Sequence, residues 1–140
     1  MAKNSISLRA AIKFHGHLGP YLVLGILAGN LAIKKLNCKK YFGLEVKVWG
    51  AHKKPRSCLV DGLQLSTGAT YGKGNIQKLN GPEIKIEFTN CLSHKKLGLD
   101  FKDNLIRQLE QVSTHEKCEL LAKKIFRINP VELFNLKLTT

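Results

Sequence analysis

The chain has 140 residues, 44% hydrophobic and 24% charged, so one soluble domain with a sizeable core is expected over residues 1–140. Its 23 lysines and arginines outnumber the 10 aspartates and glutamates, which gives a net charge of +13. This composition excludes a disordered chain. Zinc ribbons and disulfide scaffolds need closer or denser cysteines than these four: Cys38, Cys58, Cys91 and Cys118.

The chain carries no sign of secretion or of membrane insertion. The N-terminus lacks the apolar core of a secretion signal. The most apolar run, residues 21–33, contains two glycines and is shorter than the ~20 residues that span a bilayer. We therefore expect a cytoplasmic protein without membrane association.

The positive charge makes nucleic acid or an acidic protein a second-choice partner. A strongly basic surface attracts polyanions, and residues 34–56 carry eight cations against Glu45 alone. The lysines are scattered, however, and lack interleaved aromatic residues, so they also fit a surface that only keeps the protein soluble.

The first half of the chain predicts two helices and a strand. A short helix over residues 5–14, capped by Ser5 or Ser7, is followed by breakers at Gly16 and Gly19-Pro20. Residues 20–36 are apolar on nearly every face, which predicts one long buried N-terminal helix. Its Gly25 and Gly29 lie on one face and indicate close packing of another helix or of a partner protomer. Residues 44–49 alternate as a strand does.

The second half predicts further strands and helices. We expect a helix over 58–65, a glycine-rich loop over 67–75, and a hairpin of strands 75–79 and 83–89 around Asn80-Gly81. Helices over 100–112 and 114–126 and a strand over 131–138 complete the pattern. The predicted fold class is α+β, with an antiparallel sheet packed against helices.

Two histidines in the breaker-rich loop are candidate metal ligands. His15 and His17 stand two residues apart, so both rings can reach one ion. The alternative is that one is a core histidine with its hydrogen bonds satisfied and the other a donor at a helix end.

Cys58 is the candidate thiol. At a helix start beside Arg56 and two lysines, its pKa is expected to fall, and a thiolate is what a metal or an electrophile requires. Otherwise Cys58 is a buried core cysteine. Asp61 stabilises the helix start, orients a histidine or carries a proton.

The loop over residues 68–75 contains Lys73 but does not form a nucleotide-binding P-loop, because no hydroxyl residue or apolar helix follows the lysine. It remains able to offer backbone N–H groups and Lys73 to an anion, or it is simply a turn.

Three segments together carry a family resemblance: 14–20 (FHGHLGP), 58–64 (CLVDGLQ) and 67–75 (TGATYGKGN). The chain resembles the FmdE family of formylmethanofuran dehydrogenase subunits, directly over about residues 8–90. The resemblance implies an α+β core domain, commonly a homodimer, with a metal cavity lined by these His and Cys residues. It also implies a molybdenum or tungsten oxidoreductase as partner, although it does not establish an activity.

The chain departs from the family motif F-H-G-H-x-C-P-G, because Gly19 replaces the cysteine and Tyr21 the last glycine. His15, His17 and Cys58 remain as candidate ligands, which favours zinc, with nickel or iron as other divalent transition metals. A bound zinc would activate water, with Cys58, Asp61 and Lys73 as candidate catalytic residues. The lost thiol argues against dithiol redox chemistry.

Overall fold

The computed structural model describes residues 6–140, and Ser5, one of the two predicted cap residues, lies outside them. The elements follow one another in the order α1 (Leu8–His15), α2 (Pro20–Leu36), β1 (Leu44–Trp49), α3 (Cys58–Thr67), β2 (Ile76–Leu79), β3 (Lys85–Asn90), β4 (Lys96–Phe101), α4 (Asp103–Gln111), α5 (His115–Phe126), a 3-10 turn (Pro130–Glu132) and β5 (Phe134–Thr139).

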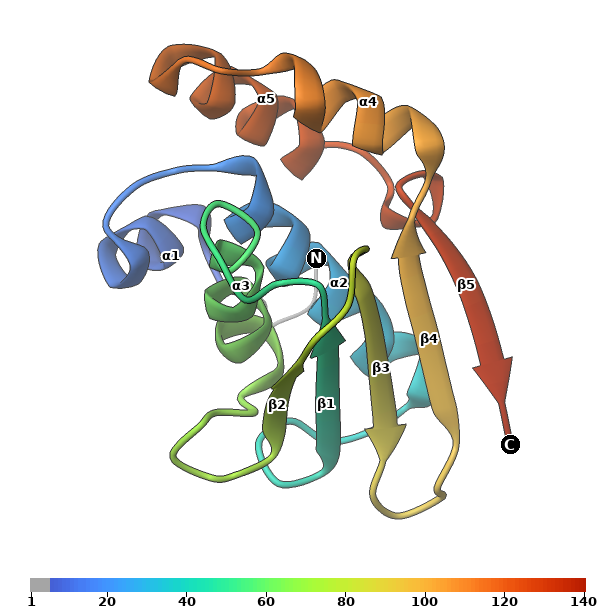
Figure 1. The fold of residues 1–140 in the computed structure, drawn as a ribbon. Coiled ribbons are helices and arrows are strands. Elements are labelled where there is room, and N and C mark those ends of the chain that lie inside the picture. Colours follow the sequence, from blue (N-terminus) through green and yellow to red (C-terminus); the bar gives the residue numbers. More distant parts are fainter. Residues whose placement is uncertain (1–5) are drawn as a thin grey trace.

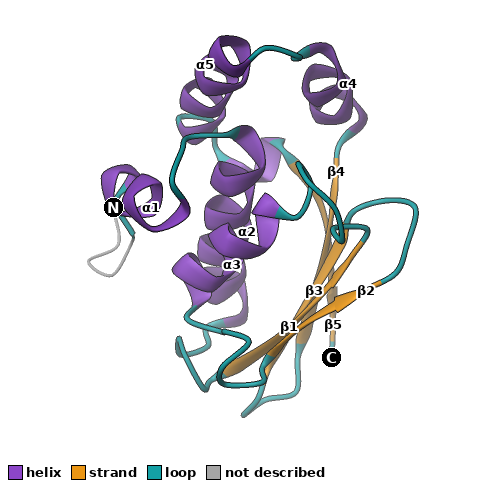
Figure 2. Ribbon diagram, turned by 60° about the vertical axis from the view of Figure 1, so that its left-hand side comes forward, coloured by secondary structure: helices purple, strands orange, loops and turns teal. Residues whose placement is uncertain are grey.

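The strands form one sheet in the order β2-β1-β3-β4-β5 (Figure 1). Helices α2 and α3 cover one face, α1 lies outside them, and α4 and α5 lie across one end (Figure 2). On β1 and β4, buried and more exposed residues alternate, because only one face of the sheet meets helices. The α+β class is thus confirmed.

The sheet is mixed, so the prediction of an antiparallel sheet is wrong in part. β2 pairs with β1 in parallel, with Val46 opposite Ile76, whereas β1, β3, β4 and β5 pair antiparallel. The hairpin predicted around Asn80-Gly81 does not form, because β2 and β3 flank β1 on opposite sides. α3 connects β1 to β2, and a helical crossover of this kind joins parallel strands.

β4 was not foreseen in the sequence. Leu97, Leu99 and Phe101 alternate along it and are buried, but Phe101 fits the helical pattern of the following segment equally well. The helix predicted over 100–112 therefore begins later, at Asp103.

α2 lies among the helices and the sheet, and 12 of its 17 residues are buried. It begins at Pro20, which suits a first helical turn, and ends at Asn37 in the left-handed conformation. Within residues 6–140, no helix has both the length and the apolar character needed to cross a bilayer.

The glycines of α2 allow α3 to approach closely. A Cβ at Gly25 would lie 2.2 Å from the Leu59 carbonyl oxygen, and one at Gly29 would lie 1.9 Å from Ser66 Oγ. Ser66 Oγ also donates a hydrogen bond to the Gly25 carbonyl at 3.1 Å. Of the two partners left open by the sequence, the glycine face therefore packs against another helix of the same chain, and this contact positions Cys58 at the start of α3.

Candidate metal centre

His15 is fixed at the end of α1 and reaches toward α3. Gly16 ends α1 with a left-handed φ of 104°, and its N–H donates to the Ile12 carbonyl at 2.7 Å. Only 10% of the His15 side chain is exposed, and its Nδ1 lies 2.5 Å from Asp61 Oδ2 in the first turn of α3. The carboxylate thus sets the orientation of the imidazole ring.

The second ring nitrogen of His15 is buried and has no hydrogen-bond partner among the described residues. An unsatisfied buried polar group costs about 1–3 kcal/mol. A carboxylate at Nδ1 favours the tautomer that leaves the lone pair on Nε2, which is the arrangement found behind many metal-ligating histidines.

The structure brings His15, His17 and Cys58 together. One potential ligand atom from each lies within 4.8 Å of the others. The rings of His15 and His17 stack with their centroids 4.6 Å apart. These donors come from the end of α1, the loop before α2 and the first residue of α3, and their role as metal ligands stays a prediction.

The electrostatics of Cys58 differ from the expectation. Partial burial raises the pKa of its thiol, the Asp61 carboxylate raises it further, and Lys54 only partly opposes both effects. The expected lowering of this pKa is therefore wrong. Arg56 donates instead to the Pro82 carbonyl at 2.8 Å, and Asp61 lies closer to the thiol than the sequence suggested.

His17 is the more exposed histidine of the pair. Desolvation lowers its pKa, and the neighbouring His15 and His115 lower it further. A neutral imidazole with a free lone pair is the ligating form, so this environment prepares His17 to coordinate an ion near neutral pH.

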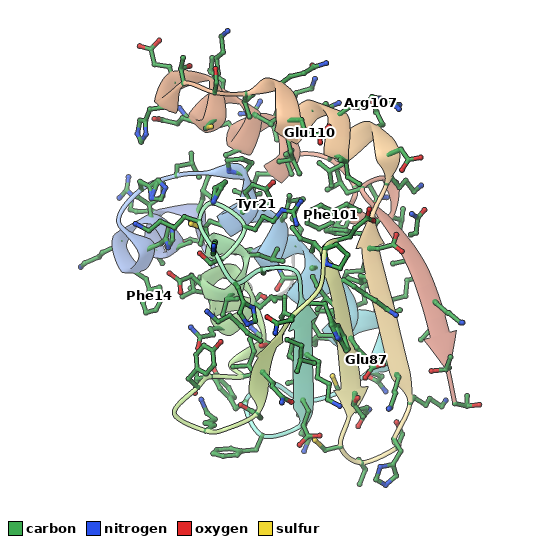
Figure 3. The ribbon with its side chains drawn as sticks, viewed as in Figure 1. Phe14, Tyr21, Glu87, Phe101, Arg107 and Glu110 are labelled. Atoms are coloured by element: carbon green, nitrogen blue, oxygen red, sulfur yellow. The ribbon has the colours of Figure 1, made fainter. Side chains whose placement is uncertain are left out.

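A cavity of about 320 Å³ opens beside His17 and Cys58. One wall belongs to α2 and its preceding loop, and the opposite wall to α4, α5 and the residues between them. Tyr21, on the α2 side, lies below α4 in Figure 3. Burial raises the pKa of the Tyr21 hydroxyl, while a hydrogen bond with Arg56 opposes the shift.

The comparisons with known proteins agree with this geometry. The family model described as "FmdE, Molybdenum formylmethanofuran dehydrogenase operon" matches residues 14–135. The chain belongs to the FmdE family. The match includes both histidines, Cys58 and the helices that build the cavity.

Two similar proteins support this membership. The crystal structure of an FmdE-like protein of the tungsten formylmethanofuran dehydrogenase type, from Syntrophus aciditrophicus, shares the fold, with a TM-score of 0.65 and 21% identity over 92% of this chain and 67% of that one. A probable S-adenosyl-L-methionine-binding protein from Archaeoglobus fulgidus is 32% identical over 73 residues. That match spans 49% of this chain and only 19% of the Archaeoglobus protein.

Gly19 occupies the position of the cysteine in the FmdE motif, and the structure leaves space for a side chain there. A Cβ on Gly19 would lie 3.6 Å from His17 Nε2, which is an ordinary van der Waals distance, and would meet no other described atom within 4 Å. The backbone at Gly19 is extended (φ −140°), a conformation open to any residue.

Sequence reasoning missed His115. It begins α5, and its ring stacks on that of His17 with the centroids 6.0 Å apart. Cys118, one turn later, lines the same cavity. Neither residue belongs to a motif, so only the packing of α5 against α2 shows that they lie at the site.

The structure does not bring Lys73 to this cluster. Lys73 follows the C-terminal end of α3, whereas Cys58 begins that helix. The Lys73 ammonium donates to the Gly68 carbonyl at 2.8 Å and to Thr70 Oγ1 at 3.4 Å. These contacts give it a role within its own loop, and its catalytic role stays a prediction.

Proposed function

We propose that the chain is a metal-binding protein of the FmdE family that holds one divalent transition-metal ion, preferably zinc, through His15, His17 and Cys58. The observation that carries the proposal is His15 Nε2, which is buried, lacks a partner among the described residues and belongs to a group of three donors within 4.8 Å. Two nitrogens and one sulfur suit zinc well, and three protein ligands leave a coordination position for water or another ligand.

The chain's own residues have distinct parts in this proposal. A bound zinc ion supplies Lewis acidity and lowers the pKa of a coordinated water. Asp61 positions His15 through Nδ1. The walls of the 320 Å³ cavity limit access to the open side of the site and set the size of any small molecule that binds there.

The family relationship suggests a protein partner. The family description names a molybdenum formylmethanofuran dehydrogenase operon, and the Syntrophus protein is described as FmdE-like, after the tungsten enzyme. We therefore extend the proposal to association with a molybdenum or tungsten oxidoreductase. The homodimer and the cytoplasmic location stay predictions from the sequence, and mass measurement in solution tests the former.

Metal content tests the central proposal. Protein is purified anaerobically without chelators, and its metals are measured by plasma mass spectrometry. We expect about one zinc per wild-type chain and a near-complete loss of zinc in Cys58→Ala and His17→Ala. Cys91→Ala and His52→Ala are matched controls, because Cys91 and His52 are exposed and outside the cluster, and both should retain the metal.

A positioning variant separates metal binding at this cluster from binding elsewhere. Asp61→Asn keeps the shape of the side chain but removes the charge that orients His15, so zinc affinity should fall about 10–100-fold while the fold is retained. Competition against a chromophoric chelator measures the affinity. The absence of stoichiometric metal in the wild type, or equal metal content in wild type and Cys58→Ala, would contradict the proposal.

A further inference from the structure

Two aromatic side chains are exposed beside a lysine at the end of α3 remote from Cys58. Tyr41 is 58% exposed and Phe42 is 75% exposed. The Lys73 ammonium lies 5.8 Å from the centroid of the Tyr41 ring and 5.7 Å from that of Phe42. Tyr71, in the same loop as Lys73, is 51% exposed. We call Tyr41, Phe42, Tyr71 and Lys73 the aromatic–lysine platform.

The backbone beneath the platform is held by several contacts. Tyr41 adopts a left-handed φ of 71°, which is unfavourable for a bulky residue and persists only where neighbours enforce it. Its N–H donates to the Thr67 carbonyl at 2.9 Å, and its carbonyl accepts from Asn75 Nδ2 at 2.5 Å. A Cβ on Gly68 would lie 2.4 Å from the Tyr41 ring. The α2–β1 and α3–β2 connections are thereby fastened together (Figure 1).

Lys73 is oriented without using all of its donors. Its ammonium carries three N–H groups, and the Gly68 carbonyl and Thr70 Oγ1 accept two hydrogen bonds at 2.8 and 3.4 Å. The remaining N–H can meet an anionic oxygen next to two aromatic faces. These residues are widely separated along the chain, so the sequence pattern alone shows no aromatic neighbours for the lysine.

The charge of the whole chain selects the kind of partner. A second copy carries the same +13 charge and would be repelled, and a neutral apolar surface would gain nothing from the lysine. A polyanion with planar faces matches both features, because bases stack on exposed aromatic rings while phosphates meet cations. We propose that the aromatic–lysine platform binds single-stranded RNA or DNA, independently of the metal centre.

Fluorescence anisotropy tests this proposal with labelled oligouridylate and oligothymidylate of about twelve nucleotides, and a duplex of equal length for comparison. We expect both single strands to bind more tightly than the duplex, with affinity falling steeply as salt rises. Preference for one of the two strands would identify RNA or DNA as the source. Lys73→Gln should reduce the slope of log affinity against log salt by about 0.7, the loss of one phosphate contact.

Substitutions of Phe42 distinguish base stacking from apolar contact. Phe42→Leu keeps an apolar side chain but removes the ring, and should weaken binding about tenfold, whereas Phe42→Trp should maintain or tighten it. Phe14→Ala is the matched control and should bind as the wild type does. Phe14 is 59% exposed and points outward from α1, near the opposite end of α3 (Figure 3).

Three results would overturn the proposal. One is the absence of single-strand binding at low salt. Another is equal affinity for single strand and duplex, which would indicate charge alone. The last is unchanged affinity in Phe42→Leu with a circular dichroism spectrum like that of the wild type, which would assign the platform to an apolar protein contact.

Discussion

His15 combines three properties that the exposed His52 and His94 lack: a side chain only 10% exposed, a carboxylate partner, and a second ring nitrogen that is buried without a hydrogen bond to any described residue. Burial alone would be typical of a core histidine, the alternative that the sequence left open. The unpartnered Nε2 beside two other donors is what favours the metal-ligand interpretation, because core histidines normally satisfy both nitrogens.

Gly19→Cys should strengthen metal binding. The Cβ position lies 3.6 Å from His17 Nε2, and the extended backbone accepts a side chain without strain. A fourth protein ligand should tighten zinc binding about tenfold or more. Chelator competition gives the affinity, and cobalt substitution should show stronger thiolate-to-metal absorption. Gly19→Ala is the control, since it adds the Cβ alone, and tighter binding in that variant would contradict a ligand role for the new thiol.

Zinc affinity should rise with pH. Burial and Asp61 raise the pKa of Cys58, so the thiol is protonated at pH 7 and must lose its proton when zinc binds. The lowered pKa of His17 leaves that ring neutral at pH 7, so it releases no proton there. Affinity should therefore increase about tenfold per pH unit between about pH 7 and 8, one proton being released. Titrations at several pH values measure the slope, which should vanish in Cys58→Ala.

At the scale of elements, the contact between α2 and α3 determines where the donors lie. A Cβ on Gly62 would stand 2.2 Å from the Leu22 carbonyl oxygen and 2.8 Å from Gly25 Cα. The two backbones therefore touch directly. This closeness keeps Cys58 and Asp61 next to the loop that carries the two histidines.

Gly62→Ala should destabilise the fold. Alanine would gain about 1 kcal/mol of helix propensity, but the backbone clash with α2 outweighs it, so we expect a net loss of about 2–3 kcal/mol. Thermal unfolding followed by circular dichroism should show a melting temperature lower by roughly 5–10 °C. In the control Gly72→Ala, the new Cβ meets only Thr70 Oγ1, at 3.8 Å, and stability should change by less than about 0.5 kcal/mol.

Local patterns predicted elements better than their pairing. The run over 20–36 and the alternation over 44–49 carry their own periodicity, and α2 and β1 occupy these residues. The partner of β2 depends on the path of α3, which no turn signal encodes, so Asn80-Gly81 was misleading. Similarly, the motifs indicate His15, His17 and Cys58, whereas His115 joins the site only through the packing of α5.

For the whole molecule, the three donors lie on two distant parts of the chain, so metal binding should couple to global stability. Zinc at about 100 times its dissociation constant stabilises the folded state by about 2.7 kcal/mol, which should raise the melting temperature by roughly 5–10 °C. Differential scanning fluorimetry with and without zinc measures the shift. Cys58→Ala should lose it and Cys91→Ala should keep it, and an equal shift in both variants would place the ion elsewhere.

The glycine contact between α2 and α3 also limits how the molecule can move. Helices that pack through side chains can slide past each other by small shear displacements. Backbones that touch at Gly25 and Gly62 leave no such freedom, because sliding would drive Cα atoms into carbonyl oxygens. The cavity can therefore widen only on its other wall, by a hinge-like displacement of α4 and α5, so His115 would move with any entering molecule while Cys58 remains in place.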